Sequence, residues 1–426
     1  MKTELQGEVT LASRVQSRHR DMINVSAVYY NLCSHYGNLN WWPASSPYEV
    51  IVGAVLTQNT AWGNVEKAIA NFTYDMPLSP ELVEIISTEE LINIIRPAGF
   101  FNQKAMYLKA VTTWYKQYDY DVETVKRQSL PALRKELLAV KGIGEETADS
   151  ILLYAFGFPT FVIDAYTRRL LTRLGYANIP KKYDDVKTIF ETELPLDAEL
   201  YNNYHACIVI NAKEHCKSKP KCDGCPLSGV CDTFVQIKAN DIKSYLAEIL
   251  DDKRYKHTLA VCDTAVNLAQ RHGVDTQKAF LAALLHDCAR GLDTEQLINY
   301  CDEHNIQLDD YMRNDINPVH AFVGADMAKQ CFGINDIDIL NAISRHAIGC
   351  EEMTLLDKVI LVADATEPTR KGCDVDDARL AAGISLDKAL PLAMRIKSRY
   401  LEGRPMHPSS VKMLEKYMYG GRQIAN

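Results

Sequence analysis

The sequence predicts an all-α protein of two domains, and three observations support this prediction. Apolar residues recur with helical spacing along both halves of the chain. Clear alternation of apolar and polar residues, which would indicate β-strands, does not stand out in either half. At 426 residues the chain is also too long for one ordinary hydrophobic core. We therefore expect one domain over residues 1–235 and a second over residues 236–426.

Composition narrows the classes of function. The chain is 47% hydrophobic and 24% charged, which is ordinary for a globular protein, and it has no apolar run of the roughly 18 residues that a membrane span needs. Its formal net charge is −8, so nucleic-acid binding would require a local basic face. The first residues, MKTELQGEVTLASR, lack the apolar stretch of a secretory signal. We expect a cytoplasmic protein that does not bind membranes.

The first half opens with helical patterns over residues 22–37 and 48–72. They are separated by an aromatic, proline-containing loop, in which Ser46 can cap the helix that begins near Pro47. That helix ends in the polar segment LTQNT, where Gln58 could simply be part of a helix cap. Further amphipathic helices are expected over residues 80–86, 88–95, 102–117 and 130–139.

A glycine-containing turn follows the last of these helices. Gly142-Ile143-Gly144 lies between two apolar helical segments and predicts a tight helix-hairpin-helix. Glycines would let the backbone N–H groups of this turn approach a phosphate, although a plain turn between two helices is the alternative. Asp164 follows an apolar run and opens the next helix, where a simple N-cap role would explain it when taken alone.

Four of the twelve cysteines lie in one short segment, CKSKPKCDGCPLSGVC. They are Cys216, Cys222, Cys225 and Cys231, with lysines and prolines between them. Four thiolates so close together make a poor apolar core but a good metal cage, because thiolates favour zinc or iron–sulfur centres. A pair of disulfides is a further alternative, which a reducing compartment disfavours.

In combination, these features resemble the endonuclease III superfamily of DNA glycosylases over roughly residues 25–232. The hairpin, the aspartate 20 residues after Gly144 and the cysteine loop 52 residues after Asp164 carry the resemblance. It implies a helix-hairpin-helix glycosylase fold, damaged double-stranded DNA as partner and a 4Fe-4S cluster on the four cysteines. It further implies that Gly142 and Gly144 contact the DNA backbone and that the Gln58 segment fills the gap left by a flipped base. The Asp164 carboxylate would stabilise the sugar cation or activate water.

Two positions depart from the family pattern. Members that also cleave the strand carry a lysine two residues after the second glycine, where it forms a Schiff base, and this position is Glu146 here. We therefore expect base release without strand cleavage. The closest resemblance is to the branch of the family that removes alkylated bases such as 3-methyladenine, and three segments carry it: SPYEVIVGAVLTQNT, RPAGFFNQKA and ETADSILLYAF. The first cysteine gap is five residues instead of the usual six. Four aromatic residues could stack on a base, with core packing as the alternative for each: Tyr29, Trp41, Trp42 and Trp62.

The second half begins with an expected connector over residues 233–245 and is again helical, but its chemistry differs. A single histidine on an apolar helix is more often a hydrogen-bonded core residue than a metal ligand. His286 and Asp287 differ, because two adjacent polar groups at the end of a buried helix are costly to leave unpaired. Imidazole and carboxylate together suit a metal site. Further candidate ligands lie at or near apolar helical segments: His257, His320, His346 and Asp364.

The order H…HD…H…H…D resembles the HD superfamily of metal-dependent phosphohydrolases over about residues 240–420. The flanks RYKHTLAV, LLHD and LVADATEPTR are most similar to the YqeK-type symmetrical diadenosine tetraphosphate hydrolases. The resemblance implies two divalent or trivalent metal ions, with iron expected, and a dinucleoside polyphosphate substrate. One metal would be held by His257, His286, Asp287 and Asp364, and Asp287 would bridge to a second held by His320 and His346. Three residues become candidates for supporting the ligands or contacting phosphate: Arg290, Glu367 and Arg370.

One departure and two alternatives remain. The segment His346-Ala-Ile-Gly replaces hydroxyl residues that are more usual after this histidine, which could shift substrate preference. The first half could be a DNA-binding module without catalysis, which Asp164 disfavours. The second half could be a nucleotide sensor, which the complete ligand set disfavours. The sequence predicts no oligomeric state.

Overall fold

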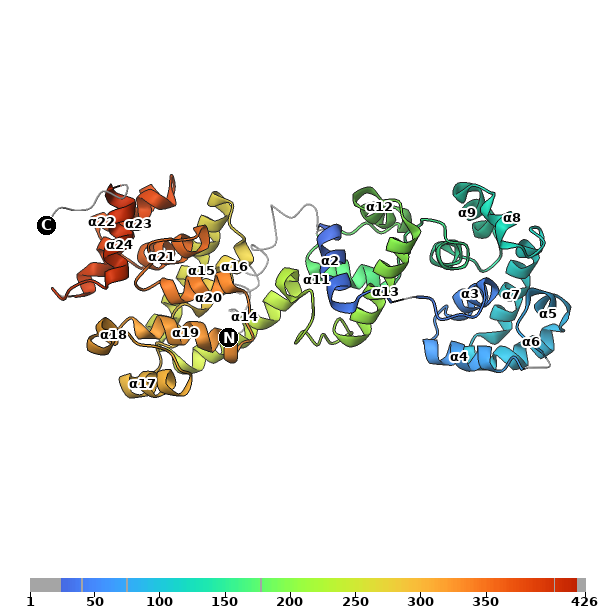
Figure 1. The fold of residues 1–426 in the computed structure, drawn as a ribbon, viewed down its shortest axis with the longest axis horizontal. Helices are drawn as coiled ribbons and strands as arrows, with labels where there is room; N and C mark the ends of the chain where they lie inside the picture. The colour runs from blue at the N-terminus through green and yellow to red at the C-terminus, as the bar shows by residue number, and fades with distance from the viewer. Residues whose placement is uncertain (1–23, 40, 74–75, 177, 402, 420–426) are drawn as a thin grey trace, which may run out of the picture. The chain divides into compact units, whose positions relative to one another are not determined.

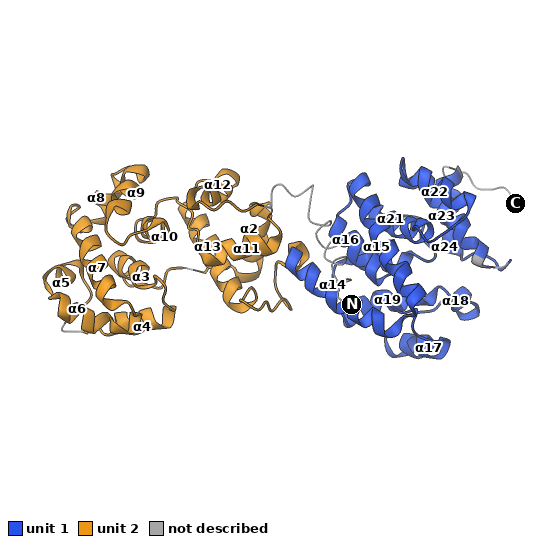
Figure 2. Cartoon of the chain, turned by 180° about the vertical axis from the view of Figure 1, so that it is seen from behind, with its two compact units in different colours: residues 1–17, 231–426 blue, residues 18–230 orange. Residues whose placement is uncertain are grey.

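The computed structural model describes residues 24–39, 41–73, 76–176, 178–401 and 403–419. Within these ranges the chain is helical and contains no β-strand, so the all-α prediction is confirmed (Figure 1). The chain divides into two compact units between Val230 and Cys231, here called the N-terminal and the C-terminal unit (Figure 2). None of the described helices is both long and apolar enough to cross a membrane.

The N-terminal unit is built from short helices, most of which begin at a side-chain cap or a proline. They are α2 (Val25–Tyr36), α3 (Pro47–Leu56), α4 (Trp62–Ala70), α5 (Pro80–Ile85), α6 (Thr88–Ile95), η1 (Arg96–Ala98), α7 (Phe101–Lys116), α8 (Val122–Lys126), α9 (Leu130–Ala139), α10 (Glu145–Ser150), the π-helical segment η2 (Ile151–Ala155), α11 (Ala165–Leu174), α12 (Tyr183–Glu193), α13 (Ala198–Glu214) and η3 (Ser228–Val230).

Helix α3 lies at the centre of one core of this unit. The Ser46 side chain accepts a hydrogen bond from the Glu49 backbone N–H, so the predicted cap is confirmed. Residues from Tyr48 to Val55 are buried almost without interruption, as expected for a helix that is apolar on all sides. The polar segment that follows Leu56 is therefore fixed to a buried helix.

A buried ion-pair network fixes the helices around the hairpin. Asp149 of α10 is fully buried and accepts two hydrogen bonds from Arg134 of α9, at 2.9 and 3.2 Å. Lys187 of α12 and the Thr160 hydroxyl complete the set, at 3.1 and 2.9 Å from Asp149 Oδ1. Because a buried carboxylate is tolerated only when it is paired, Asp149 joins α9, α10 and α12.

The C-terminal unit is a second helical bundle, in which α21 is buried along nearly its whole length between neighbouring helices. Its elements are α14 (Asp232–Ile249), α15 (Asp252–His272), α16 (Thr276–Leu285), α17 (Thr294–Glu303), α18 (Asp310–Asn314), α19 (Val319–Gln330), α20 (Ile337–Arg345), α21 (Leu355–Thr366), α22 (Cys373–Ala382), α23 (Leu386–Ser398), η4 (Arg399–Leu401) and α24 (Pro408–Tyr419).

The connector expected over residues 233–245 is wrong, because these residues belong to the 18-residue helix α14. Ala239, Ile242 and Leu246 recur on one helix face and are buried in the core of the C-terminal unit. This face packs against α16, and the packing stabilises α14. The domain boundary expected at residues 235/236 lies inside α14.

We predict that Asp149→Ala destabilises the N-terminal unit by about 3–5 kcal/mol, because it leaves two partly buried cations without their shared carboxylate. All four tryptophans of the chain lie in this unit, so tryptophan fluorescence during urea unfolding of the full chain reports it selectively. Asp184→Ala is the matched control, because Asp184 binds the same arginine but its side chain is 58% exposed. The control should cost less than about 1 kcal/mol, and an equal cost for both variants would contradict the prediction.

Candidate functional site

Three histidines of the C-terminal unit are oriented by the same backbone interaction. His286 directly follows α16, His346 directly follows α20, and His320 lies in the first turn of α19. Each ring pairs Nδ1 with the carbonyl oxygen three residues earlier, at 2.7, 2.6 and 2.7 Å for Ala283, Asn317 and Ile343 respectively. A neutral imidazole that donates through Nδ1 carries its lone pair on Nε2. The fold therefore presents three Nε2 lone pairs.

These lone pairs converge on Asp287. His320 Nε2 and His346 Nε2 lie 3.2 and 3.6 Å from Asp287 Oδ1, and 3.2 Å from each other. His286 Nε2 lies 3.7 Å from Asp287 Oδ2, and it is buried without a hydrogen-bond partner. Acceptor atoms at such separations repel one another unless a cation lies among them. The donor set therefore fits a metal ion.

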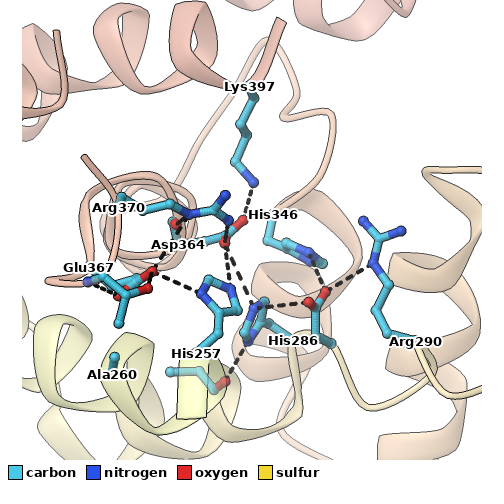
Figure 3. Close-up of polar contacts among 12 residues, drawn as sticks. His257, Ala260, His286, Arg290, His346, Asp364, Glu367, Arg370 and Lys397 are labelled. Carbon is cyan, nitrogen blue, oxygen red and sulfur yellow. Dashed lines mark hydrogen bonds and ion pairs between the residues drawn. The ribbon is translucent and has the colours of Figure 1, made fainter. Parts of the chain in front are cut away.

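A second group shares His286. His257 Nε2 lies 3.1 Å from Asp364 Oδ1, and His286 Nε2 lies 4.0 Å from the same oxygen. The other ring nitrogen of His257, Nδ1, pairs with Glu367 Oε1 at 3.1 Å (Figure 3). The structure thus brings all six ligand-type residues predicted from the sequence into one cluster. Five of them form two overlapping groups that share His286, and His320 joins them through its contacts with Asp287 and His346.

The charges of this cluster suit metal binding. Burial lowers the pKa of His286 to about 4 and that of His320 to about 3, so both rings are neutral near neutral pH. Burial alone would raise the pKa of Asp287 and of Asp364. The surrounding histidines hold the pKa of Asp287 well below its usual value, and Lys397 together with neighbouring histidines does the same for Asp364. Neutral imidazoles beside ionised carboxylates are the ligands that transition metals take.

The three further candidates have different surroundings. Arg290 Nε lies 3.5 Å from Asp287 Oδ1 and Arg370 Nη2 lies 3.2 Å from Asp364 Oδ1, and each arginine side chain is 28% exposed. Both therefore lie at the edge of the cluster, where a phosphate could reach them. Glu367 is fully buried and binds His257, which makes it a support for that histidine (Figure 3).

Sequence reasoning missed Lys397, which reaches the cluster from α23. Its Nζ contacts Asp364 Oδ2, on the opposite side of the carboxylate from His257 (Figure 3). A lysine in the last turn of an amphipathic helix carries no sequence signal of such a role. Only the packing of α23 against α21 places it there.

In the N-terminal unit, Asp164 is the N-cap of α11. Its Oδ1 accepts hydrogen bonds from the Thr167 backbone N–H and hydroxyl, at 2.7 and 2.9 Å. Its Oδ2 lies 3.6 Å from His205 Nε2, while His205 Nδ1 is bonded to the Tyr154 hydroxyl. Asp164 therefore caps α11 with one carboxylate oxygen, as predicted. Its second oxygen faces the buried His205.

The surroundings of Asp164 contain a second carboxylate and aromatic rings. Burial would raise the pKa of Asp164, but His205 and Thr167 hold it below its ordinary value. Burial and then Asp164 raise the pKa of Glu146, the residue that replaces the family's lysine. Trp42 contacts Tyr154, with ring centroids 5.2 Å apart. Sequence reasoning missed His205 and Tyr154, since each lies in an apolar helical stretch.

Two other predicted aromatic residues have partners as well. Trp62 lies against Trp42, with ring centroids 5.1 Å apart, so this pair forms one aromatic cluster with Tyr154. Tyr29 packs against Tyr204 of α13, at 5.0 Å, and Trp41 lies 6.2 Å from Trp42. Tyr29 is thus part of the helix packing.

The predicted hairpin forms between α9 and α10. Gly142 has φ +87°, and a Cβ there would lie 2.1 Å from the Tyr107 ring, so only glycine fits. Gly144 is the residue before α10 and faces open space. Gln58 donates to the Gly142 carbonyl oxygen at 3.0 Å, which places the Gln58 segment at the hairpin.

A buried lysine, Lys104, holds the Gln58 segment in place through hydrogen bonds. Lys104 Nζ donates to the Leu56 and Ala98 carbonyl oxygens and to the Thr60 hydroxyl. Burial lowers the pKa of Lys104 to about 8. Its contacts begin at the end of α3 and end beyond Gln58, so the segment is held at both sides.

Two arginines of α11 contact the first cysteine of the loop. Arg173 Nη1 lies 3.1 Å from Cys216 Sγ, and Arg169 Nε donates to the Cys216 carbonyl oxygen. Helix α11 therefore fixes the position of Cys216. The thiols of Cys216, Cys222 and Cys225 lie in the loop after α13, whereas Cys231 is the residue before α14.

Comparisons with known proteins match the two halves of the chain to two different families. Residues 52–195 match the HhH-GPD superfamily of base excision DNA repair proteins, and residues 254–369 match the HD domain. A Methanocaldococcus jannaschii protein named as a DNA repair glycosylase is 47% identical over 206 residues, 48% of this chain and 94% of that protein. The Bacillus subtilis symmetrical bis(5'-nucleosyl)-tetraphosphatase is 37% identical over 165 residues, 38% of this chain and 87% of that protein. A solved structure of a predicted HD superfamily hydrolase from Clostridium acetobutylicum aligns with a TM-score of 0.41 and 37% identity, over 42% of this chain and 97% of that chain.

Proposed function

Because the chain belongs to the HhH-GPD superfamily of base excision DNA repair proteins in its first half and to the HD-domain family in its second, we propose that it carries two separate activities. The first releases damaged bases, alkylated purines in particular, from double-stranded DNA. The second hydrolyses diadenosine tetraphosphate symmetrically to ADP. The convergence of six metal-ligand side chains on one buried cluster is the observation that carries the second proposal.

The glycosylase proposal rests on the environment of Asp164. Thr167 fixes one carboxylate oxygen, and the low pKa keeps the group ionised. An ionised, oriented carboxylate can stabilise the positive charge that grows on the sugar as the glycosidic bond breaks. Because Glu146 stands where a Schiff-base lysine would be needed, the reaction releases the base and leaves the strand intact. Gly142, Gly144 and Gln58 form the proposed DNA contact.

We predict that Asp164→Asn lowers release of alkylated bases by roughly a hundredfold or more, because the central charge is lost. Asparagine can still accept the Thr167 N–H, so the α11 cap and DNA binding should persist. Single-turnover base release from a methylated duplex measures the effect. Asp197→Asn, at the exposed cap of α13, is the matched control and should leave the rate unchanged. A covalent adduct trapped with borohydride would sink the proposal of base release alone.

We propose that Cys216, Cys222, Cys225 and Cys231 hold a 4Fe-4S cluster. The spacing of the four cysteines in one short segment and the arginine contacts that position Cys216 support a thiolate-bound centre. When bound, the cluster supplies a rigid cross-link within the loop.

We predict about four iron and four sulfide per chain bound at these cysteines after anaerobic purification, with broad absorption near roughly 400 nm. Cys222→Ser should remove this absorption because a ligand is lost, whereas Cys331→Ser, at an exposed cysteine far along the chain, should retain it. One zinc ion and no sulfide at this loop would favour the structural zinc alternative.

In the C-terminal unit, we propose two metal ions, with iron as their identity. His257, His286, Asp287 and Asp364 would hold one of them, and His320 and His346, together with Asp287, would hold the other. When bound, such a pair activates water and neutralises charge on the attacked phosphate. The backbone carbonyl oxygens that pair with Nδ1 orient the rings of His286, His320 and His346. Arg290 and Arg370, at the edge of the cluster, are positioned to contact the phosphates of the substrate.

The substrate proposal has independent support from a relative. The Bacillus subtilis protein, which is 37% identical over most of its length, is named as a symmetrical tetraphosphatase. The segments around His257, His286 and Asp364 resemble that type as well. We therefore propose diadenosine tetraphosphate as the substrate.

We predict that Asp287→Ala abolishes tetraphosphate hydrolysis, because the bridging carboxylate touches both metal sites. Chromatography of the nucleotide products measures the effect and also tests the substrate: symmetrical attack gives only ADP, whereas asymmetrical attack gives ATP and AMP. Base release by the same preparation is the internal control and should not change, because independent sites seldom couple. Full hydrolysis by the variant, or by chelator-treated protein, would refute the two-metal proposal.

A further inference from the structure

The two oxygens of Asp364 have different partners. Oδ1 lies 3.1 Å from His257 Nε2 and 4.0 Å from His286 Nε2, the two histidines of its proposed metal site, and 3.2 Å from Arg370 Nη2. Oδ2 faces the other way and contacts Lys397 Nζ (Figure 3). A carboxylate with one oxygen toward a metal position and the other bound by a lysine has a defined orientation.

Lys397 is well placed for this contact. It lies in the last turn of α23, and its side chain is only 18% exposed where it meets Asp364, which is 9% exposed. It also lies beyond residue 369, where the match to the HD domain ends. The contact therefore belongs to the part of the chain that follows the matched region.

Fixing the carboxylate has a physical consequence for metal binding. Rotation of a free aspartate about its last side-chain bond would exchange Oδ1 with Oδ2 and cost ordering energy whenever a metal binds. Partners that orient a ligand side chain typically change metal affinity by about 10–100-fold when they are removed. The Lys397 charge also balances a carboxylate that is buried beside Asp287.

We propose that Lys397 is a positioning residue, which holds Asp364 with Oδ1 toward the metal ion that His257 and His286 also bind. This inference rests on the proposed metal centre. It assigns Lys397 to one of the two metal positions only, because no contact joins it to His320 or His346 among the interactions described for these residues.

A second lysine of the same helix pair provides a matched control. Lys358 of α21 binds Asp387 of α23 at 2.7 Å, so it also joins α21 to α23. Its partner is 61% exposed and lies outside the metal cluster. Loss of Lys358 thus removes a similar ion pair between the same helices without touching a proposed metal ligand.

The experiment uses the full chain, freed of metal with a chelator and titrated with Mn²⁺, which prefers carboxylate and imidazole ligands over cysteine thiolates. Electron paramagnetic resonance of free Mn²⁺ gives the number and affinity of bound ions. We expect two ions for the unaltered chain. Lys397→Met should weaken one of them by about 10–100-fold and leave the other unchanged. Lys358→Met should leave both unchanged, and Lys397→Arg should restore most of the affinity.

The possible results separate the proposals. Two sites of unaltered affinity in Lys397→Met would overturn the positioning role, and so would equal weakening of both sites. If the methionine variant does not fold, as judged by circular dichroism, Lys397→Gln applies the same test. No Mn²⁺ pair in the unaltered chain would instead refute the proposed metal centre. Two bound ions without tetraphosphate hydrolysis would refute only the proposed substrate.

Discussion

The hydrogen bond from a histidine Nδ1 to the carbonyl oxygen three residues earlier is the interaction on which the C-terminal site depends. It occurs at His286, His320 and His346, always at or near a helix end. Each bond fixes both the ring direction and the position of the lone pair, so the fold itself prepares the ligands. Burial also lowers the pKa of His286 and of His320, so these two rings stay neutral near neutral pH. Helix packing, ligand geometry and protonation are therefore parts of one arrangement.

In the N-terminal unit, two aspartates depend on the groups that surround their carboxylates. Asp149 is fully buried and the Asp164 side chain is 12% exposed, and the two carboxylates have different partners. Asp149 pairs with Arg134 and Lys187 and so joins helices. Asp164 has hydroxyl, amide and imidazole neighbours instead of arginine or lysine among its described contacts. A carboxylate in the second situation can still act on a positive charge outside the protein.

Much of this could be predicted from the sequence because the informative residues lie at the ends of periodic segments. The pattern of His286-Asp287 after a buried helix, or of Gly142 in a turn, is local and readable. Lys397 and His205 could not be found this way, since their partners lie on helices whose packing no local pattern specifies. Helix α14 was missed because its apolar face is completed only by the core of the C-terminal unit. Contacts between helices that are distant in the sequence were therefore the part that could not be predicted.

The π-helical segment η2 affects where the Tyr154 side chain lies in the N-terminal unit. Its five residues, Ile151–Ala155, continue α10 with wider turns and include Tyr154, which binds His205. A segment with one extra residue per turn can be converted to a regular α-helix by a single deletion. Because the wider turn accommodates the extra residue, the flanking residues would nearly keep their register, and the change would fall on the residues inside the turn. The wider turn therefore helps to determine the direction in which Tyr154 meets His205.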